Sequence, residues 1–434
     1  MKIQNIQLKN YRNFENYSVN FGKETTIFIG KNGSGKTNLL SAVKHSLSFI
    51  FSKKQDEIQY NFIASSDQKV NSFAPTDPRY DYSRDIPDYS YPISIRTIAK
   101  EMGRNISWEF LKENGSSGLK DTLYRNANIQ FWDNYIQDGT IKELPILAFF
   151  SDSYPHIKTN IGTNIQEKLN SGFPLAPNTA YYKWDEEKNC NGIWVQYFTM
   201  QWKNDKFQNG RGDEKYLSLV NNKIVEFSRT VSERTNSDDI KVKKLEIEAR
   251  GKNDELIVVF EKGMRIPFNQ LPQGYKRMFS IVFDIVNRAY ILNSNAIPSG
   301  IVIIDELELH LHPSIAQEVL NGLKLTFPNI QFIVSSHSPL VITNFKQNAN
   351  NIIYRLFEDN GEYKNEQLDD LYGIDYNSGL REWMETPYRN LRLEELKKAY
   401  DYWKNTGDKE KIAILRNKSK GEVGEDSGFY KSLG

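Results

Sequence analysis

An eight-residue run near the start of the chain has the residue types and spacing of a phosphate-binding loop. The run fits the pattern G-x-x-x-x-G-K-[ST] and reads Gly30-Lys31-Asn32-Gly33-Ser34-Gly35-Lys36-Thr37. Its glycines let backbone N–H groups turn toward phosphate oxygens, and a helix that begins there adds the positive end of its dipole. We expect Lys36 to contact the β- and γ-phosphates of ATP and Thr37 to offer its hydroxyl to Mg²⁺.

Two carboxylates follow a strongly apolar segment in the second half of the chain. Residues 301–304 predict a buried strand, and Asp305 and Glu306 come directly after it. At the end of a strand beside a phosphate loop, Asp305 is predicted to hold Mg²⁺ and Glu306 to polarise the attacking water as a general base. Without the phosphate loop, an ordinary strand cap would explain the pair equally well.

A histidine follows the next predicted strand, residues 331–334. His337 comes 32 residues after Asp305, with one predicted helix between two parallel strands. Both residues should therefore lie at the same edge of the sheet, where His337 would sense the γ-phosphate. A single histidine in a loop is otherwise most often a surface residue.

Apolar periodicity predicts the elements that position these side chains. Strands are expected within residues 1–29 and at 92–96, 106–110, 144–150, 244–248, 256–260, 301–304 and 331–334, and helices at 37–51, 216–231, 274–292, 315–327 and 391–403. The alternation predicts an α/β fold with a mixed or parallel sheet flanked by helices. The strands between residues 92 and 150 are expected to share one mixed sheet, and residues 418–434 to be loose.

We expect four regions along the chain. They are an N-terminal lobe with the phosphate loop (1–150), a mostly helical inserted subdomain (151–231), a C-terminal lobe with the acidic strand and His337 (232–367), and a helical tail (368–434). The tail helix carries apolar residues on one face. It could dock onto its own core or onto a partner.

Composition excludes several classes of protein. Of the 434 residues 39% are hydrophobic, which excludes a disordered chain, and 56 basic against 55 acidic residues leave no global field for nucleic acid or membrane. Cys190 is the only cysteine, which excludes an internal disulfide and a multi-cysteine zinc site and favours the cytoplasm. The most apolar run, residues 278–292, is interrupted by Asp284, Asn287 and Arg288, so no membrane span is expected.

Several motifs together resemble the ABC-type ATPase heads of the RecF, SMC and OLD group. They are Glu308-Leu309-His310-Leu311-His312-Pro313 after Asp305-Glu306, the run Ser336-His337-Ser338-Pro339, and the tail segment 371–378. The run Leu271-Pro272-Gln273-Gly274-Tyr275-Lys276-Arg277 resembles the signature L-S-x-G-Y-R, in which Gly274 matches and Pro272 replaces the serine. Within the group, the chain resembles the class of predicted ATP-binding proteins involved in virulence, which includes ATPases of the anti-phage Septu and certain retron systems.

The resemblance implies an ATPase that uses ATP and Mg²⁺ and forms a homodimer, or a multiple of dimers, around the nucleotide. Gly274 of one copy would then face the phosphate loop of the other. It also implies a regulatory subunit in phage defence that controls a separate effector, a nuclease. Only His45 and His156 lie outside the ATPase motifs, so the chain assembles no His-Asn-His nuclease of its own. For the glutamine that such heads place near magnesium, Gln130 is a weak candidate, and residues 151–154 hold none.

Two alternatives stay open. A RecF-like DNA-repair ATPase or clamp would need a basic surface for DNA, for which residues 241–244 and 397–398 are candidates. A nucleotide-gated scaffold would bind ATP and hydrolyse it slowly, as a switch.

Overall fold

A computed structural model gives the structure of the chain. It describes residues 1–52, 57–64, 68–82, 86–154, 167, 169, 175–186, 191–207, 212–248, 254–294, 297–379, 383 and 390–433. The chain divides into two compact units, Met1–Gly373 and Ile374–Gly434. Cys190 and His156 lie outside the described residues.

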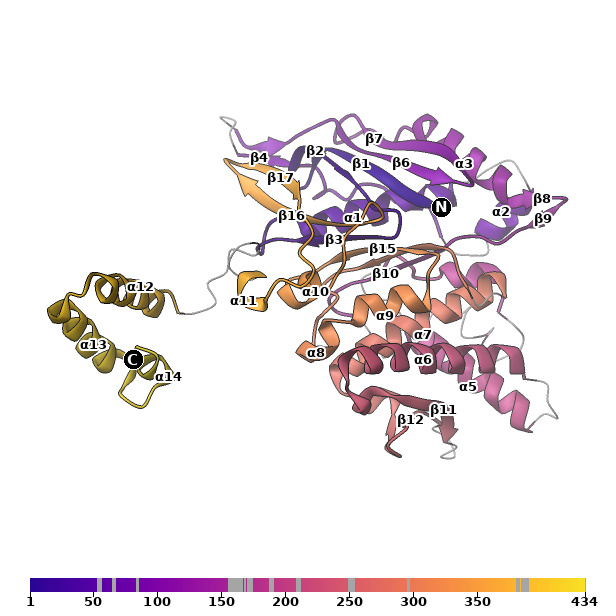
Figure 1. Cartoon of the computed structure of the whole chain (residues 1–434). Coiled ribbons are helices and arrows are strands. Elements are labelled where there is room, and N and C mark those ends of the chain that lie inside the picture. Colours follow the sequence, from indigo (N-terminus) through magenta and orange to yellow (C-terminus); the bar gives the residue numbers. More distant parts are fainter. Residues whose placement is uncertain are drawn as a thin grey trace. The chain divides into compact units, whose positions relative to one another are not determined.

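A six-stranded sheet forms the centre of the first unit (Figure 1). Its strand order is β10 (Ile146–Phe150), β14 (Gly300–Ile304), β15 (Ile330–Ser335), β3 (Thr25–Ile29), β16 (Asn351–Asp359) and β17 (Glu362–Gln367). The first five strands are parallel and β17 is antiparallel. Strands β10, β14, β15 and β3 are buried at every position, as parallel strands covered on both faces should be. This arrangement confirms the predicted α/β head with a mixed sheet flanked by helices.

The register of the strands brings four loops to one edge of this sheet. Ile304 pairs with Phe150 on one side and with Val334 on the other, and Ser335 pairs with Phe28. The carboxyl ends of β3, β10, β14 and β15 are therefore level. The segments that follow them are the phosphate loop, residues 151–154, Asp305-Glu306 and the loop with His337.

A separate antiparallel sheet has the order β2 (Phe14–Asn20), β1 (Lys2–Tyr11), β6 (Ile93–Glu101) and β7 (Arg104–Lys112). Helix α1 (Lys36–Leu47) contacts both β6 and β15, so it lies between the two sheets with its apolar side chains fully buried. The prediction that residues 92–150 share one mixed sheet is thus wrong. β6 and β7 form a tight hairpin that pairs with β1, whereas β10 pairs with β14.

Helices cover the other face of the six-stranded sheet (Figure 1). α7 (Gln273–Asn293) contacts β10, and α6 (Glu214–Thr235) contacts both α7 and α9 (Val319–Thr326). The helix predicted over 315–327 is two helices, α8 (Pro313–Ala316) and α9. They are separated at Glu318, which leaves helical dihedrals while its carboxylate pairs with Arg234 of α6.

Smaller elements complete the first unit. A three-stranded sheet of β11 (Val242–Glu248), β12 (Glu255–Phe260) and β13 (Arg265–Pro267) packs beside α6. The others are α2 (Glu57–Ala64), β4 (Tyr80–Asp81), β5 (Asp88–Tyr89), α3 (Thr122–Tyr135), β8 (Ile136–Gln137), β9 (Thr140–Ile141), α5 (Asn191–Phe207), α10 (Pro339–Thr343), and 3-10 turns at Ser48–Phe51, Pro177–Tyr181, Asp238–Ile240 and Phe268–Gln270. No helix among the described residues is long and apolar enough to cross a membrane.

The second unit consists of α11 (Tyr376–Ser378), α12 (Leu391–Thr406), α13 (Lys409–Val423) and α14 (Gly428–Lys431). α12 ends at Gly407, whose φ of 76° suits a glycine C-cap. The expectation that residues 418–434 are loose is wrong. Leu433 is fully buried, Glu422 pairs with Arg392 at 2.7 Å, and Lys397 donates to the carbonyl of Ser432 at 3.2 Å.

Candidate functional site

The phosphate loop joins β3 to α1 and closes around its own lysine. A Cβ on Gly30 would lie 2.2 Å from the carbonyl oxygen of Leu356, and the φ of Gly30 is 146°, so this position requires glycine. The Nζ of Lys36 donates to the carbonyls of Gly30 at 2.8 Å and Lys31 at 3.1 Å. Thr37, the next residue, is exposed on the first turn of α1. Its hydroxyl is thus accessible to a metal ion.

The charge of Lys36 faces the acidic end of β14. The side chain is buried, and this burial lowers its pKa to about 8, while the negative charges of Asp305, Glu306 and Glu308 act in the opposite direction. A buried ammonium close to several carboxylates can exchange its carbonyl partners for phosphate oxygens when a nucleotide arrives.

Ser335, the last residue of β15, holds both residues of the acidic pair. Its hydroxyl donates to Oδ1 of Asp305 and accepts from the amide of Glu306 at 2.9 Å. The amide of Asp305 donates to the carbonyl of Phe150 at 2.8 Å. Asp305 is therefore fixed between β10 and β15.

The site can hold magnesium through oxygen ligands. Thr37 supplies a hydroxyl and Asp305 a carboxylate, which are the hard oxygen donors that Mg²⁺ prefers. Among the described residues no group of three or more His, Cys, Asp or Glu side chains could form a metal cage. A few protein oxygens completed by phosphate and water are the usual Mg²⁺ environment at a phosphate loop, so these residues fit the ion.

Glu306 and His337, the predicted base and γ-phosphate sensor, lie close to each other. Oε1 of Glu306 lies 3.9 Å from Nε2 of His337, and both side chains are about one-third exposed. Burial raises the pKa of Glu306, and the nearby negative charge of Asp305 raises it further. Burial and the charge of Lys36 lower the pKa of His337. At neutral pH this favours a neutral imidazole beside a carboxylate that accepts a proton more readily than usual.

Gly274 lies at the start of α7 against the backbone of the same chain. A Cβ there would lie 2.4 Å from the carbonyl oxygen of His310, so the glycine has a packing role in its own chain. Pro272 is the N-cap of α7 and supplies no capping side chain.

Three side chains for which no role was predicted also surround the site. Arg277 contacts the backbone at the acidic end of β14, and Glu308 accepts from the amide of His337 at 2.5 Å. Arg12, on the turn before β2, donates to Oδ1 of Asn38, the residue after Thr37, at 2.9 Å. Two features of the sequence point to two of these residues: Arg277 is a charge within the apolar run of α7, and Arg12 lies in a polar turn next to a predicted strand.

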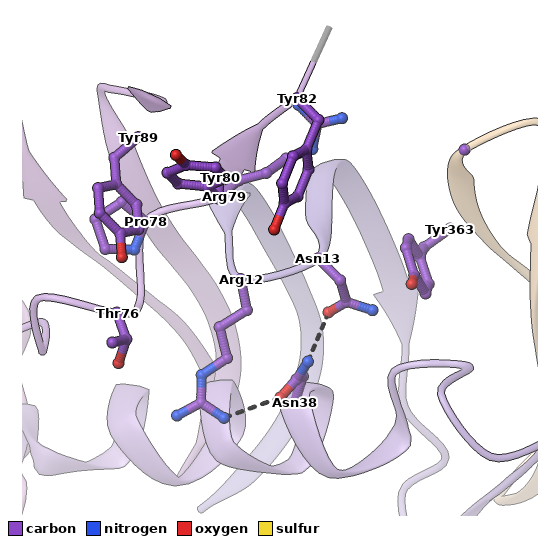
Figure 2. A pocket seen from close by; sticks show the side chains of 11 residues that line it. Arg12, Asn13, Asn38, Thr76, Pro78, Arg79, Tyr80, Tyr82, Tyr89 and Tyr363 are labelled. Carbon is purple, nitrogen blue, oxygen red and sulfur yellow. Dashed lines mark hydrogen bonds between the residues drawn. The ribbon is translucent and has the colours of Figure 1, made fainter. Parts of the chain in front are cut away.

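A cavity of about 840 Å³ opens beside the phosphate loop. Figure 2 shows Arg12, Asn38 and Asn13 joined in a chain of hydrogen bonds along its floor, with tyrosines above them. The ring of Tyr80 contacts those of Tyr82 and Tyr89 edge-on. The residues that line the cavity are Arg12, Asn13, Asn38, Thr76, Pro78, Arg79, Tyr80, Tyr82, Tyr89, Gly361 and Tyr363. Aromatic faces beside a guanidinium suit a nucleotide base and its ribose.

Other predicted candidates lie elsewhere. Gln130 is exposed on α3, whereas residues 151–154 lie at the site, joined to β14 through Arg277. Four of the five candidate DNA-binding lysines pair with carboxylates, namely Lys241 with Asp238, Lys244 with Glu246, Lys397 with Asp401 and Lys398 with Glu394. His45 is a buried core side chain of α1.

Comparisons with known proteins agree with this geometry. The family model of the AAA ATPase domain matches residues 1–342. The retron Vc95 probable ATPase of Vibrio cholerae serotype O1 biovar El Tor is 25% identical, and the match covers 82% of this chain and 74% of that protein. The retron Ec83 probable ATPase of Escherichia coli is also 25% identical, with 79% of this chain and 69% of that protein covered.

The DNA replication and repair protein RecF of Lactococcus lactis subsp. lactis (strain IL1403) is 24% identical, over 62% of this chain and 63% of that protein. Among solved structures, the SMC head domain from Thermotoga maritima is 14% identical, with a TM-score of 0.44 over 85% of this chain and 100% of that one. The predicted resemblance to RecF and to retron-associated ATPases is confirmed by the two retron proteins and RecF.

Proposed function

We propose that the chain, which belongs to the family of AAA ATPase domains, binds ATP with Mg²⁺ at the phosphate loop and hydrolyses the nucleotide. One observation carries the proposal. Lys36, Asp305, Glu306 and His337, which are up to 301 residues apart, meet at one edge of the sheet, with Glu306 and His337 3.9 Å apart.

The side chains divide the chemistry among them. Lys36 and the loop amides bind the phosphates, and Thr37 and Asp305 would hold Mg²⁺, which supplies positive charge to the phosphate oxygens when bound. Glu306 orients a water molecule and takes its proton. The neutral His337 hydrogen-bonds to the γ-phosphate as charge develops there. The cavity beside Asn38 receives the base and the ribose.

Two substitutions test the hydrolysis. Lys36→Ala should abolish binding of ATP, because it removes the cation that faces the phosphates. Glu306→Gln should keep binding and lower kcat about 100- to 10,000-fold, because the amide keeps the shape and loses the base. Glu362→Gln, a change to an exposed carboxylate on β17, is the control and should match the unmodified protein. Hydrolysis by Glu306→Gln at the unmodified rate would refute the assignment.

We further propose that the protein is the regulatory ATPase of an anti-phage system in the cytoplasm. It would dimerise around ATP, with Gly274 of each copy facing the phosphate loop of the other, and control a separate effector nuclease. The two retron ATPases, which match about four-fifths of this chain, support this proposal. Light scattering of Glu306→Gln with ATP should give a dimer or a multiple of dimers. A strict monomer under these conditions would contradict it.

A RecF-like DNA clamp is the second candidate, because RecF matches 62% of the chain. Binding of duplex DNA that weakens steeply with salt would favour it. The ion pairs of the candidate lysines favour the regulatory ATPase instead. A slow nucleotide-gated scaffold would be distinguished from both by its turnover rate.

A further inference from the structure

Arg277 lies in the second turn of α7 and is 1% exposed. Its guanidinium holds two chain segments together. Nη1 donates to three carbonyls of residues 151–154 at 2.7–3.3 Å, and Nη2 donates to the carbonyls of Asp305 at 2.7 Å and Glu306 at 3.3 Å. The arginine therefore joins α7 to the loop after β10 and to the acidic end of β14.

A buried guanidinium at a helix–sheet contact carries an unfavourable desolvation free energy. Removing its charge from water costs free energy that an apolar side chain would not. The neighbours Met278 and Phe279 are apolar and buried, as this part of α7 otherwise requires. Burial lowers the pKa of Arg277, but the charges of Asp152 and Asp305 oppose the shift, so the side chain stays a cation. Its hydrogen bonds, rather than its volume, explain its presence.

The contact with Glu306 matters because of the backbone conformation there. Glu306 has a φ of 50°, in the left-handed region that non-glycine residues seldom occupy. Its carbonyl accepts from Arg277, and its amide donates to the hydroxyl of Ser335 at 2.9 Å. With both groups held, the side chain is directed toward His337.

One turn before Arg277, α7 meets the same segment again. The Cα of Gly274 packs so closely on His310 that a Cβ would lie 2.4 Å from its carbonyl oxygen. The first turns of α7 thus contact residues 305–310 at two points: Gly274 packs against His310, and Arg277 donates hydrogen bonds to the carbonyls of Asp305 and Glu306. A displacement of the start of α7 would pull on the backbone of Glu306.

We propose that Arg277 is a positioning residue for hydrolysis: it ties the backbone of Glu306 to residues 151–154 and to the first turns of α7, so that the rate of hydrolysis, but not the affinity for nucleotide, depends on it. The inference rests on the proposed ATPase function.

The test is Arg277→Lys, which keeps the charge but replaces the fork of donors by one ammonium that cannot reach both segments. We expect kcat to fall about 10- to 100-fold, because a misplaced reactive group costs roughly that much. The dissociation constant of a fluorescent ATP analogue with Mg²⁺ should change by less than about threefold, because the phosphate loop is untouched. Thermal melting verifies that the variant is folded.

Arg288→Lys is the matched control. Arg288 is also on α7 and 1% exposed, and it also donates to backbone carbonyls, those of Ala180 and Tyr182. It lies 11 residues further along, which is about 16 Å in a helix. The kcat of Arg288→Lys should stay within about twofold of that of the unmodified protein even if the melting temperature of this variant falls. Equal losses of kcat in both variants would overturn the proposal, since Arg277 would then act through general stability.

A double substitution separates positioning from other effects. When Glu306 is already glutamine, its placement no longer matters for proton transfer, so adding Arg277→Lys should change the residual single-turnover rate by less than about twofold. The same fractional loss in both backgrounds would overturn the proposal.

The two proposals fail differently. An unmodified protein that does not hydrolyse ATP refutes the proposed function, whereas an active protein that tolerates Arg277→Lys refutes the role of Arg277. If Arg277→Lys does not fold, Arg277→Gln, which keeps an amide donor, undergoes the same measurements. Failure of both to fold beside a folded Arg288→Lys would make Arg277 a stability residue and also overturn the proposal.

Discussion

Ser335 shows how one small side chain can set the geometry of two reactive neighbours. Its hydroxyl donates to Asp305 and accepts from the amide of Glu306, and the side chain is fully buried. In the sequence it is one of three serines around His337, with nothing to distinguish it. Its role depends on the register between β14 and β15, which a local pattern does not contain.

His45 shows how burial changes the chemistry of a residue type. Its ring stacks on Phe73 at 4.8 Å between centroids and meets the edge of Phe110's ring at 5.2 Å. Burial lowers the pKa of His45 to about 4; the charge of Asp77 opposes this shift, whereas those of Lys44 and Arg12 add to it. The folded state therefore favours the neutral ring.

This burial predicts a pH dependence of stability. An unfolded histidine titrates near 6.5, so below that pH the unfolded chain binds more protons than the folded one. The stability that His45 contributes is present above about pH 6.5 and is lost as the pH falls toward 4, by about 2 kcal/mol between about pH 7 and pH 5. Urea unfolding at the two pH values measures it. His45→Phe, an apolar ring for the same aromatic cluster, should remove this part of the dependence; an unchanged difference between the two pH values would contradict the prediction.

At the scale of elements, α7 connects the signature run to the rest of the core. Gly274 and Arg277 attach its start to the acidic strand, and further along Asp284 accepts from Trp194 of α5 at 2.6 Å and pairs with Arg288. A helix with buried polar contacts at its start and further along its length has little freedom to shift without breaking one of them.

Gly274→Ala should therefore destabilise the protein even without nucleotide. The new methyl group would meet backbone atoms of His310 and Leu311, which cannot rotate away, so we expect a loss of about 1–3 kcal/mol in the free energy of unfolding. Gly421→Ala on α13 is the control, because its methyl group would meet nothing within 4 Å and should stabilise the helix by up to about 1 kcal/mol. Chemical denaturation measures both. Equal stabilities of Gly274→Ala and the unmodified protein would show that the glycine is not required by packing.

At the scale of the whole molecule, the chain has two units with separate cores. The first holds every residue of the candidate site, and the second packs around Leu396, Tyr400 and Leu433. The boundary lies between Gly373 and Ile374, a little after residue 368, where the tail was expected to begin.

Deletion of residues 374–434 should leave an ATPase that folds. The truncated chain keeps every sheet described above and all the site residues, so we expect kcat within about twofold of the full chain and one cooperative melting transition. If the tail binds the effector, the protein encoded by the neighbouring gene should no longer co-purify with the truncated chain. Aggregation or loss of nucleotide binding would instead show that the second unit is part of the core.

Local elements and candidate site residues could be predicted from the sequence alone. The apolar runs before Gly30 and Asp305, and the helical spacing after Lys36, depend on neighbours only a few residues away, so periodicity was enough to predict β3, β14 and α1. The phosphate loop, Asp305, Glu306 and His337 were predicted for the same reason.

The sequence did not predict which strands share a sheet or which distant groups meet, and the folded structure shows both. Strand pairing joins residues far apart in the chain, so the pattern within β6 or β10 cannot say which partner each will take. The hydrogen bonds from Arg277 to residues 151–154 span more than 120 residues, and the cavity beside Asn38 is assembled from four separated segments. Such contacts depend on how buried polar groups are satisfied after the chain has packed, and this information is not contained in local sequence.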